Sequence, residues 1–255
     1  MAGRFFAMGD THANIDGDKL LNWKNRHWRY SDNMDRDDFI LQLGDFGFVW
    51  AAKENRHEKK WLDQIEDQGV SILAITGNHD NIDAIRKNYP LVDFHGDKAY
   101  EVRPHIHIAP YGAYYEINGK TIFCVGGAHS HDIDDGVYHL GDPVLNELKH
   151  DPRARYRIIG LSWWPNECPN EEQRKHILDV ATQHDWKADY ILTHQPPVST
   201  VVLAGFQYKQ HDEYGVWLEQ NIRQKMEYQK FLSGHMHRDV RFDRDYILYD
   251  IPVML

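Results

Sequence analysis

The amino-acid sequence predicts an α/β protein in which two β-sheets are covered by helices. Three observations predict this class: short apolar runs that end at polar clusters, amphipathic helical segments between some of these runs, and later strand-like runs that lack long helices between them. The last observation favours two sheets over one, because a doubly wound sheet needs a helix between successive parallel strands. The length of 255 residues fits one domain spanning residues 1–255.

The strands are predicted where short runs are rich in β-branched and aromatic residues. Five such runs stop at a polar cluster, at residues 4–8, 39–43, 70–75, 189–193 and 230–234. Two further strands are predicted at residues 121–127, which end in a Gly-Gly turn, and at residues 245–253 near the end of the chain.

Two helices are predicted from their apolar periodicity and end signals. Residues 56–68 place Trp61 and Ile65 four apart, and Gly69 ends the segment. Residues 170–184 begin with Asn170 as an N-cap, followed by acidic residues in the first turn.

The composition narrows the function class. A net charge of −10 disfavours general binding to nucleic acid or to an anionic membrane surface, since both need clustered Lys and Arg. Only Cys124 and Cys168 are present, and they are interpreted as buried thiols without a disulfide framework. The first residues do not resemble a signal peptide and no apolar run reaches membrane-spanning length, so a cytoplasmic protein is predicted.

The polar clusters at the ends of the five runs carry the chemistry. The carboxyl ends of strands in an α/β fold form the crevice where ligands bind, so these clusters are expected to converge. They supply Asp10, His12, Asp45, Asn78, His79, His194, His235 and His237. Oxygen and nitrogen donors without thiolate suit Mn, Fe, Ni or Zn. The donors exceed what one ion with an open position needs, and they fit two ions if one carboxylate bridges them.

Each cluster taken alone is also compatible with an ordinary turn, loop entry or strand end. A Gly-Asp pair after a strand is a common turn signal, and the two histidines of "GHMH" are also compatible with an exposed edge strand. If each cluster were only a turn or a strand end, polar residues would have to follow five separate apolar runs by coincidence. Their joint occurrence therefore favours a shared metal site.

The ordered set of motifs resembles the calcineurin-like metallophosphoesterase superfamily, and more closely its bacterial and phage-type members. The resemblance extends from Arg4 to about Asp250. It rests on Asp10-Thr11-His12, Gly44-Asp45, Gly77-Asn78-His79-Asp80, His194 and Gly234-His235-Met236-His237. It implies a four-layer α/β/β/α sandwich of two mixed β-sheets flanked by helices, with a dinuclear metal site at the sheet edge.

The resemblance also implies a role for each residue. Asp10, His12 and His237 would hold one ion, and Asn78, His194 and His235 the other. Asp45 would bridge the two ions. His79 would protonate the leaving group, and Asp80 would orient His79. The implied reaction is hydrolysis of a phosphodiester, a nucleotide or a small phosphate ester by a hydroxide that bridges two divalent ions, with Mn²⁺ as first choice and Fe, Zn or Ni as alternatives.

Three positions depart from the family pattern. Ala13 stands where the family usually has Gly, so this turn either differs slightly or carries strain, since alanine disfavours positive φ. Residues 46–48 lack the Asp-Arg of the protein-phosphatase branch, and Asp80 stands where that branch has Glu. The last two differences disfavour a phosphoprotein phosphatase. The closer resemblance, to bacterial and phage-type members, implies action on phosphodiesters, nucleotides or small phosphate esters, and a phosphodiesterase is predicted in preference to a monoesterase.

Substrate contacts leave a weaker signal. His129, Trp50 and Trp163 are candidates for substrate binding, with packing or solvent exposure as the alternative for each. Arg153, Arg155 and Arg157 are interpreted as a solvated strand face rather than a phosphate site.

Two other functions stay open: a catalytically silent scaffold of the same fold that acts through protein interaction, and a metal-dependent hydrolase of another bond, such as an amide. The expected partner is a small-molecule or nucleotide phosphoester, and the sequence does not predict an oligomeric state.

Overall fold

Two large mixed β-sheets dominate the computed structural model, which describes residues 3–13, 15–23, 33–207 and 212–255. The seven-stranded sheet has the order β15-β1-β2-β3-β6-β5-β4, and the six-stranded sheet has the order β13-β14-β12-β11-β8-β7. The predicted α/β fold with two mixed sheets is therefore confirmed.

The seven-stranded sheet has a parallel centre and antiparallel edges. Strands β1, β2, β3 and β6 run parallel, whereas β15, β5 and β4 pair antiparallel with their neighbours. The strands are β1 (Phe5–Met8), β2 (Phe39–Gln42), β3 (Ser71–Ala74), β4 (Leu91–Phe94), β5 (Asp97–Arg103), β6 (Ile106–Ile108) and β15 (Val253–Met254).

The six-stranded sheet is built in a similar way. Strands β8, β11, β12 and β14 run parallel, and β7 and β13 close the edges in antiparallel pairs. The strands are β7 (Ala113–Ile117), β8 (Lys120–Cys124), β11 (Lys187–Leu192), β12 (Glu227–Ser233), β13 (Val240–Phe242) and β14 (Asp245–Ile247). The five runs that end at polar clusters thus become β1, β2, β3, β11 and β12.

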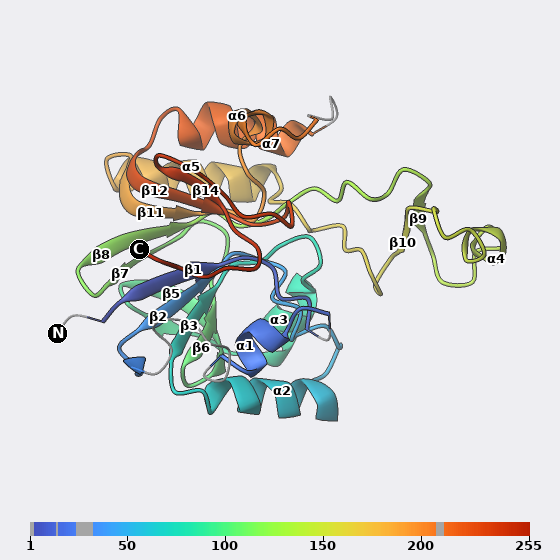
Figure 1. Cartoon of the computed structure of the whole chain (residues 1–255), viewed down its shortest axis with the longest axis horizontal. Helices are drawn as coiled ribbons and strands as arrows, with labels where there is room; N and C mark the ends of the chain where they lie inside the picture. Colours follow the sequence, from blue (N-terminus) through green and yellow to red (C-terminus); the bar gives the residue numbers. More distant parts are fainter. Residues whose placement is uncertain (1–2, 14, 24–32, 208–211) are drawn as a thin grey trace.

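The hydrophobic core has three parts, which the two-residue period of the strands separates. In β1, Phe5 and Ala7 enter the cluster between the sheets, whereas Phe6 and Met8 enter the cluster under the first helices. A third cluster joins the other face of the six-stranded sheet, through Ile191, to the later helices. Figure 1 shows the resulting arrangement, with α5, α6 and α7 beyond one sheet and α1, α2 and α3 beyond the other.

The helices that cover the sheets begin where capping residues stand. Asn55 and Asn170 both form capping boxes, at the start of α2 and α5 respectively, as their side-chain oxygens accept N–H bonds that the first turns leave unpaired. The helices are α1 (Asp18–Leu21), α2 (Arg56–Glu66), α3 (Ile82–Asn88), α4 (Leu145–Leu148), α5 (Glu171–Gln183), α6 (Val198–Leu203) and α7 (Glu213–Leu218), which continues into the π-helical turn η2 (Glu219–Arg223). Both predicted helices are present.

Residues 245–253 do not form the single strand that the sequence predicted. They contain β14, which belongs to the six-stranded sheet, and the first residue of β15, an edge strand of the seven-stranded sheet. The carboxylate of Asp239 accepts N–H bonds from Tyr249, Asp250 and Ile251, which bends the chain between the two strands.

An arm leaves the body of the molecule between β8 and α5. It contains the two-stranded parallel sheet of β9 (Gly136–Tyr138) and β10 (Tyr156–Ile158), with α4 between them. Figure 1 shows this arm projecting away from the two large sheets. In the described part of the chain, no helix has both the length and the apolar composition needed to span a bilayer.

Candidate metal centre

The loops that follow β1, β2, β3, β11 and β12 meet where the two sheets adjoin. One close contact links the first loop to the last, since Oδ2 of Asp10 lies 3.0 Å from Nε2 of His237. The backbone N–H of His235 donates to the other oxygen of Asp10 at 3.0 Å. The predicted convergence of these loops is therefore present, and it joins residues from both sheets.

Asp45 lies at the centre of this cluster and is buried. Its Oδ1 accepts the backbone N–H of His79 at 2.8 Å. Its Oδ2 lies 3.2 Å from Nε2 of His12 and 3.1 Å from Nε2 of His194. One carboxylate oxygen is thus adjacent to imidazoles that come from different sheets, which is the position a bridging ligand requires.

His12 and His194 each turn Nε2 toward the centre because Nδ1 is held elsewhere. Nδ1 of His12 lies 3.1 Å from the carboxylate of Asp16, and Nδ1 of His194 lies 2.6 Å from the carbonyl oxygen of Leu43. Such outer hydrogen bonds fix the tautomer of metal-binding histidines.

The charge at this cluster is also visible in the histidine pKa values. Burial lowers the pKa of His194, but the carboxylates of Asp45 and Asp10 outweigh burial and raise it to about 10. Burial also lowers the pKa of His12, but hydrogen bonds to Asp45 and Asp16 and the nearby carboxylate charges outweigh burial and raise it to about 9. The carboxylates therefore attract positive charge into a buried site.

Asn78 is oriented by a relay of hydrogen bonds. Its side-chain Nδ2 donates to Oγ of Ser130 at 3.1 Å, and this hydroxyl donates to Oε2 of Glu167 at 2.6 Å. The backbone N–H of Ser130 donates to Oε1 of Glu167 at 3.0 Å, so the buried carboxylate is held twice. The nitrogen of the Asn78 amide is used in this way, whereas its oxygen is buried without a hydrogen-bond partner among the described residues.

The donor atoms fit divalent ions. Within the described part of the chain, buried atoms without a hydrogen-bond partner include Oδ2 of Asp10, Oδ1 of Asn78 and Nε2 of His194. Two of these atoms have close neighbours but no hydrogen bond, since Oδ2 of Asp10 lies 3.0 Å from His237 and Nε2 of His194 lies 3.1 Å from Asp45. Buried polar atoms are nearly always hydrogen-bonded, so these three atoms point to a missing partner such as a cation. The 3.0–3.2 Å contacts match the separation of neighbouring donors around an ion with bonds of about 2.1 Å at right angles.

Three groups of side chains, among the described residues, bring their donor atoms within 4.8 Å of one another and could hold an ion. They are Asp10 with His12 and His237, His12 with Asp45 and His79, and Asp10 with Asp45 and His194. The first of these groups is the set that the resemblance implied for one ion.

The backbone adopts unusual conformations to present these side chains. Positive φ angles occur at His12, Asp45, His235 and His237, a conformation that costs non-glycine residues energy and concentrates at functional sites. Ala13 also has a positive φ, of 45°, so the turn carries the strain that its sequence predicted as one alternative.

Glycines let the loops approach the ligands closely. A Cβ on Gly77 would lie 2.2 Å from Oδ1 of Asp45, and one on Gly234 would lie 2.4 Å from Oδ1 of Asp10. Both contacts are far below van der Waals distance, which explains why glycine precedes Asn78 and His235 in their motifs.

Asp80 lies under the cluster rather than against the imidazole of His79. Its buried carboxylate accepts the backbone N–H groups of Phe46, Gly47 and Gly77 at 2.8–3.2 Å. Burial raises the pKa of Asp80 to about 6, with a further contribution from Asp45. Among the described residues no hydrogen bond joins Asp80 to the His79 side chain, and Asp80 instead holds the loops after β2 and β3 together.

Arg157 is the group that faces His79, and sequence reasoning had assigned it to a solvated face. Its Nη2 lies 3.5 Å from Nε2 of His79, and its guanidinium pairs with the carboxylate of Asp132 through two nitrogens. Burial lowers the pKa of His79, and the charge of Arg157 lowers it further, against the opposing effect of Asp45. The contact spans 78 residues of sequence and has no local signal.

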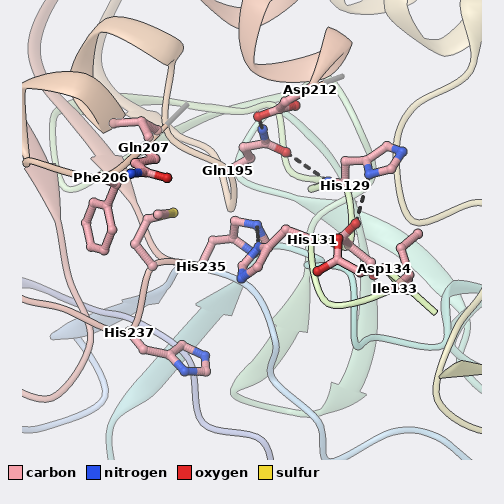
Figure 2. A pocket seen from close by; sticks show the side chains of 13 residues that line it. His129, His131, Ile133, Asp134, Gln195, Phe206, Gln207, Asp212, His235 and His237 are labelled. Atoms are coloured by element: carbon pink, nitrogen blue, oxygen red, sulfur yellow. Dashed lines mark hydrogen bonds between the residues drawn. The ribbon is translucent and has the colours of Figure 1, made fainter. Parts of the chain in front are cut away.

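Two cavities open on either side of His237. The first, of about 510 Å³, is lined by His129, His131, Gln195, Phe206 and His235 among others, and Figure 2 shows these side chains around the opening. The second, of about 690 Å³, is lined by His12, His79, Trp50, Trp61, Trp164 and Arg157 among others. Of the predicted substrate contacts, His129 lines the first cavity and Trp50 the second. Trp163 lines neither, whereas its neighbour Trp164 lines the second.

Comparison with known proteins gives one match over most of the chain. A family model described as calcineurin-like phosphoesterase matches residues 3–239. No curated protein sequence matches the chain.

Proposed function

The chain belongs to the calcineurin-like phosphoesterase family, and from this premise we propose that it hydrolyses a phosphodiester at a centre of two divalent ions. The observation that carries the proposal is the position of Asp45, whose Oδ2 is within 3.2 Å of both His12 and His194. One carboxylate oxygen between two sets of donors is what a pair of ions requires, because such ions lie roughly 3.5–4 Å apart.

We assign the donors to the ions as the resemblance implies. Asp10, His12 and His237 bind one ion, Asn78, His194 and His235 bind the other, and Asp45 binds both. The three unpaired buried atoms in these sets support the assignment. Mixed oxygen and nitrogen donors without thiolate favour Mn²⁺, which is the proposed metal. When bound, the two ions supply an activated water at neutral pH and positive charge for the phosphoryl oxygens.

His79 is the proposed proton donor to the leaving oxygen. Its backbone is fixed by Asp45, and its imidazole lines the second cavity. The pKa of His79 is lowered by burial and by Arg157, so an anionic ester between the two residues would offset the charge of Arg157 and favour the protonated imidazole. Proton donation of this kind contributes roughly 10²–10⁴-fold to rate.

Arg157 is the proposed contact to a phosphoryl oxygen. Asp132 holds the guanidinium in the second cavity, next to His79 and on the same side as His12. A planar guanidinium binds phosphoryl oxygens through more than one N–H group. This fixed positive charge helps explain how a chain with a net charge of −10 could accept an anionic ester.

The preference for a diester rests on the two cavities that meet at His237. A phosphodiester carries two organic groups, and each cavity offers room for one of them. Because His79 lines only the second cavity, the leaving group would lie there, among Trp50, Trp61 and Trp164. A monoester would leave one cavity without a substrate group.

The test is hydrolysis by metal-stripped protein before and after addition of Mn²⁺, with bis-p-nitrophenyl phosphate, p-nitrophenyl phosphate and a panel of nucleotides. Turnover of the diester that exceeds turnover of the monoester and disappears with chelator is expected. His79→Ala should slow the reaction, most for poor leaving groups, whereas His150→Ala changes an exposed histidine outside both cavities and serves as control. No turnover of any ester by protein with both ions bound would instead favour the silent scaffold.

A further inference from the structure

The segment of residues 129–131 lies across one of the two proposed ion sites. Ser130 accepts the side-chain N–H of Asn78, and the backbone N–H of His129 donates to Oε1 of Gln195 at 2.8 Å. Gln195 directly follows His194 in the chain. The segment is therefore fixed to two loops that supply donors to the second ion.

His131 contacts His235, which lies in the third loop assigned to the second ion. Its Nδ1 lies 3.0 Å from Nε2 of His235, and the centres of the two rings are 4.6 Å apart. Figure 2 shows the two imidazoles side by side in the middle of the cavity view. Residues 129–131 therefore contact all three loops that supply the second ion besides Asp45. Ser130 contacts Asn78, His129 contacts the residue after His194, and His131 contacts His235.

The distance between the two imidazoles has a counterpart within the proposed ligand set. Nitrogen and oxygen donors there lie 3.0–3.2 Å apart, at the contacts of Asp10 with His237 and of Asp45 with His194. Neighbouring donors on an ion with bonds of about 2.1 Å at right angles lie about 3.0 Å apart. A hydrogen bond between two neutral imidazoles would have a similar length, so the distance alone does not choose between them.

The surroundings favour a shared ion over a hydrogen bond. The proposal takes Nε2 of His235 as its ligand atom for the second ion, and a proton donated by His131 would occupy this atom. Oδ1 of Asn78 and Nε2 of His194, which belong to the same ligand set, are buried and have no hydrogen-bond partner among the described residues. The proposed second ion would supply the partner that these atoms lack, whereas a hydrogen bond between His131 and His235 involves neither of them.

We propose that His131 is a further ligand of the ion held by Asn78, His194 and His235, through its Nδ1. The proposal rests on the proposed function, since it requires that the second ion binds. With Asp45 the ion then has five protein donors, and an ion that accepts six ligands keeps one position for water or substrate. The next residue, Asp132, pairs with Arg157, so the same short segment joins the second ion to the phosphoryl contact.

The experiment is metal binding by the whole chain, measured without turnover. Metal-stripped wild-type protein, His131→Ala and His139→Ala are titrated with Mn²⁺, and the bound ions are counted by elemental analysis. His139 is the matched control, because it is an exposed histidine on the same arm and lines neither cavity. The expected result is two ions in the wild type and in the control, and one ion with unchanged affinity plus one at least about 10-fold weaker in His131→Ala.

A second measurement separates a ligand from a residue that only supports one. In protein loaded with Co²⁺, ring N–H groups of ligating histidines give strongly shifted proton resonances. His131→Ala should lose one such resonance and keep the others, whereas a supporting role would leave their number unchanged and overturn the proposal.

The outcomes distinguish this inference from the function on which it rests. Two ions of wild-type affinity in His131→Ala overturn the assignment of His131 and leave the dinuclear centre intact. A higher affinity in this variant overturns it as well, because it would mean that His131 blocks His235. A wild-type chain that binds fewer than two ions overturns both. Thermal unfolding of the metal-free variants verifies that they fold, which the exposure of His131 leads us to expect.

Discussion

Replacement of Arg157 by alanine should weaken catalysis without removing the ions. The guanidinium lies 3.5 Å from His79 but touches none of the proposed ligands in the contacts described. A hydrogen bond between a charged donor and a phosphoryl oxygen is worth about 1.5–3 kcal/mol. The side chain is 25% exposed, so water screens part of this energy and the lower half of the range applies. A loss of about 1.5–2 kcal/mol corresponds to a fall in kcat/KM of about 10- to 30-fold.

The assay is the steady-state hydrolysis of a series of aryl phosphodiesters by Mn²⁺-loaded protein. If Arg157 binds the phosphoryl group, the loss in kcat/KM should be similar for good and poor leaving groups, which separates it from His79. Arg157→Lys keeps the charge but not the planar donor pair and should recover part of the loss. Inhibition by vanadate should weaken in parallel, since this anion resembles the phosphoryl group.

Arg153→Ala is the control, because Arg153 lies exposed on the same arm and lines neither cavity. Wild-type kcat/KM in Arg157→Ala would refute the assignment of Arg157 as a phosphoryl contact. An equal loss in Arg153→Ala would show that the charge of the arm as a whole, and not this contact, assists the reaction.

Three further changes test the centre and the fold. Asp45→Asn should reduce bound Mn²⁺ below two ions per chain and remove most activity, and two ions bound with wild-type affinity would contradict the bridging role. Glu58→Gln should lower the free energy of unfolding by about 1–3 kcal/mol in urea titrations, because the Glu58 carboxylate accepts three backbone N–H bonds and an amide nitrogen cannot accept them. Burial lowers the pKa of His107 to about 4, below its value of about 6.5 in the unfolded chain, so folding stability is present near pH 7 and is lost as the pH falls toward 4. His107→Phe should remove about 1 kcal/mol of the stability difference between pH 7 and pH 5, after allowance for water near the ring, and a pH dependence equal to that of the wild type would contradict this.

The sequence predicted the parts of the fold that short-range patterns determine. Buried strands need apolar runs, and the run at residues 70–75 becomes β3 with the four residues Ser71–Ala74. The start of α5, directly after its N-cap Asn170, could be predicted because the cap is a local interaction. The prediction of one strand at residues 245–253 was wrong because the bend between β14 and β15 depends on Asp239, a side chain outside the run.

The site residues also divide into those that local sequence patterns predict and those that depend on distant contacts. Asp45 and His194 could be found because both stand at the end of an apolar run, where chemistry concentrates in α/β folds. Arg157 could not be found, because its contact with His79 depends on where β10, which contains Arg157, lies relative to the loop after β3. Asp80 follows His79 in the sequence, yet adjacency in the chain does not place two side chains in contact. The roles of the ligands, the cytoplasmic location, the bacterial or phage type and the choice of Mn²⁺ stay predictions.

The hydrogen bond from His235 to Asp10 closes a loop of 225 residues, and this has a consequence for biosynthesis. Ribosomes add about 5–20 residues per second, so the first acidic loop waits roughly 10–45 s before its partner histidine has been translated. During that interval Asp10 lacks the N–H group of His235 and the imidazole of His237, two of the groups that contact its carboxylate. The proposed site of Asp10, His12 and His237 is therefore complete only when nearly the whole chain has been translated.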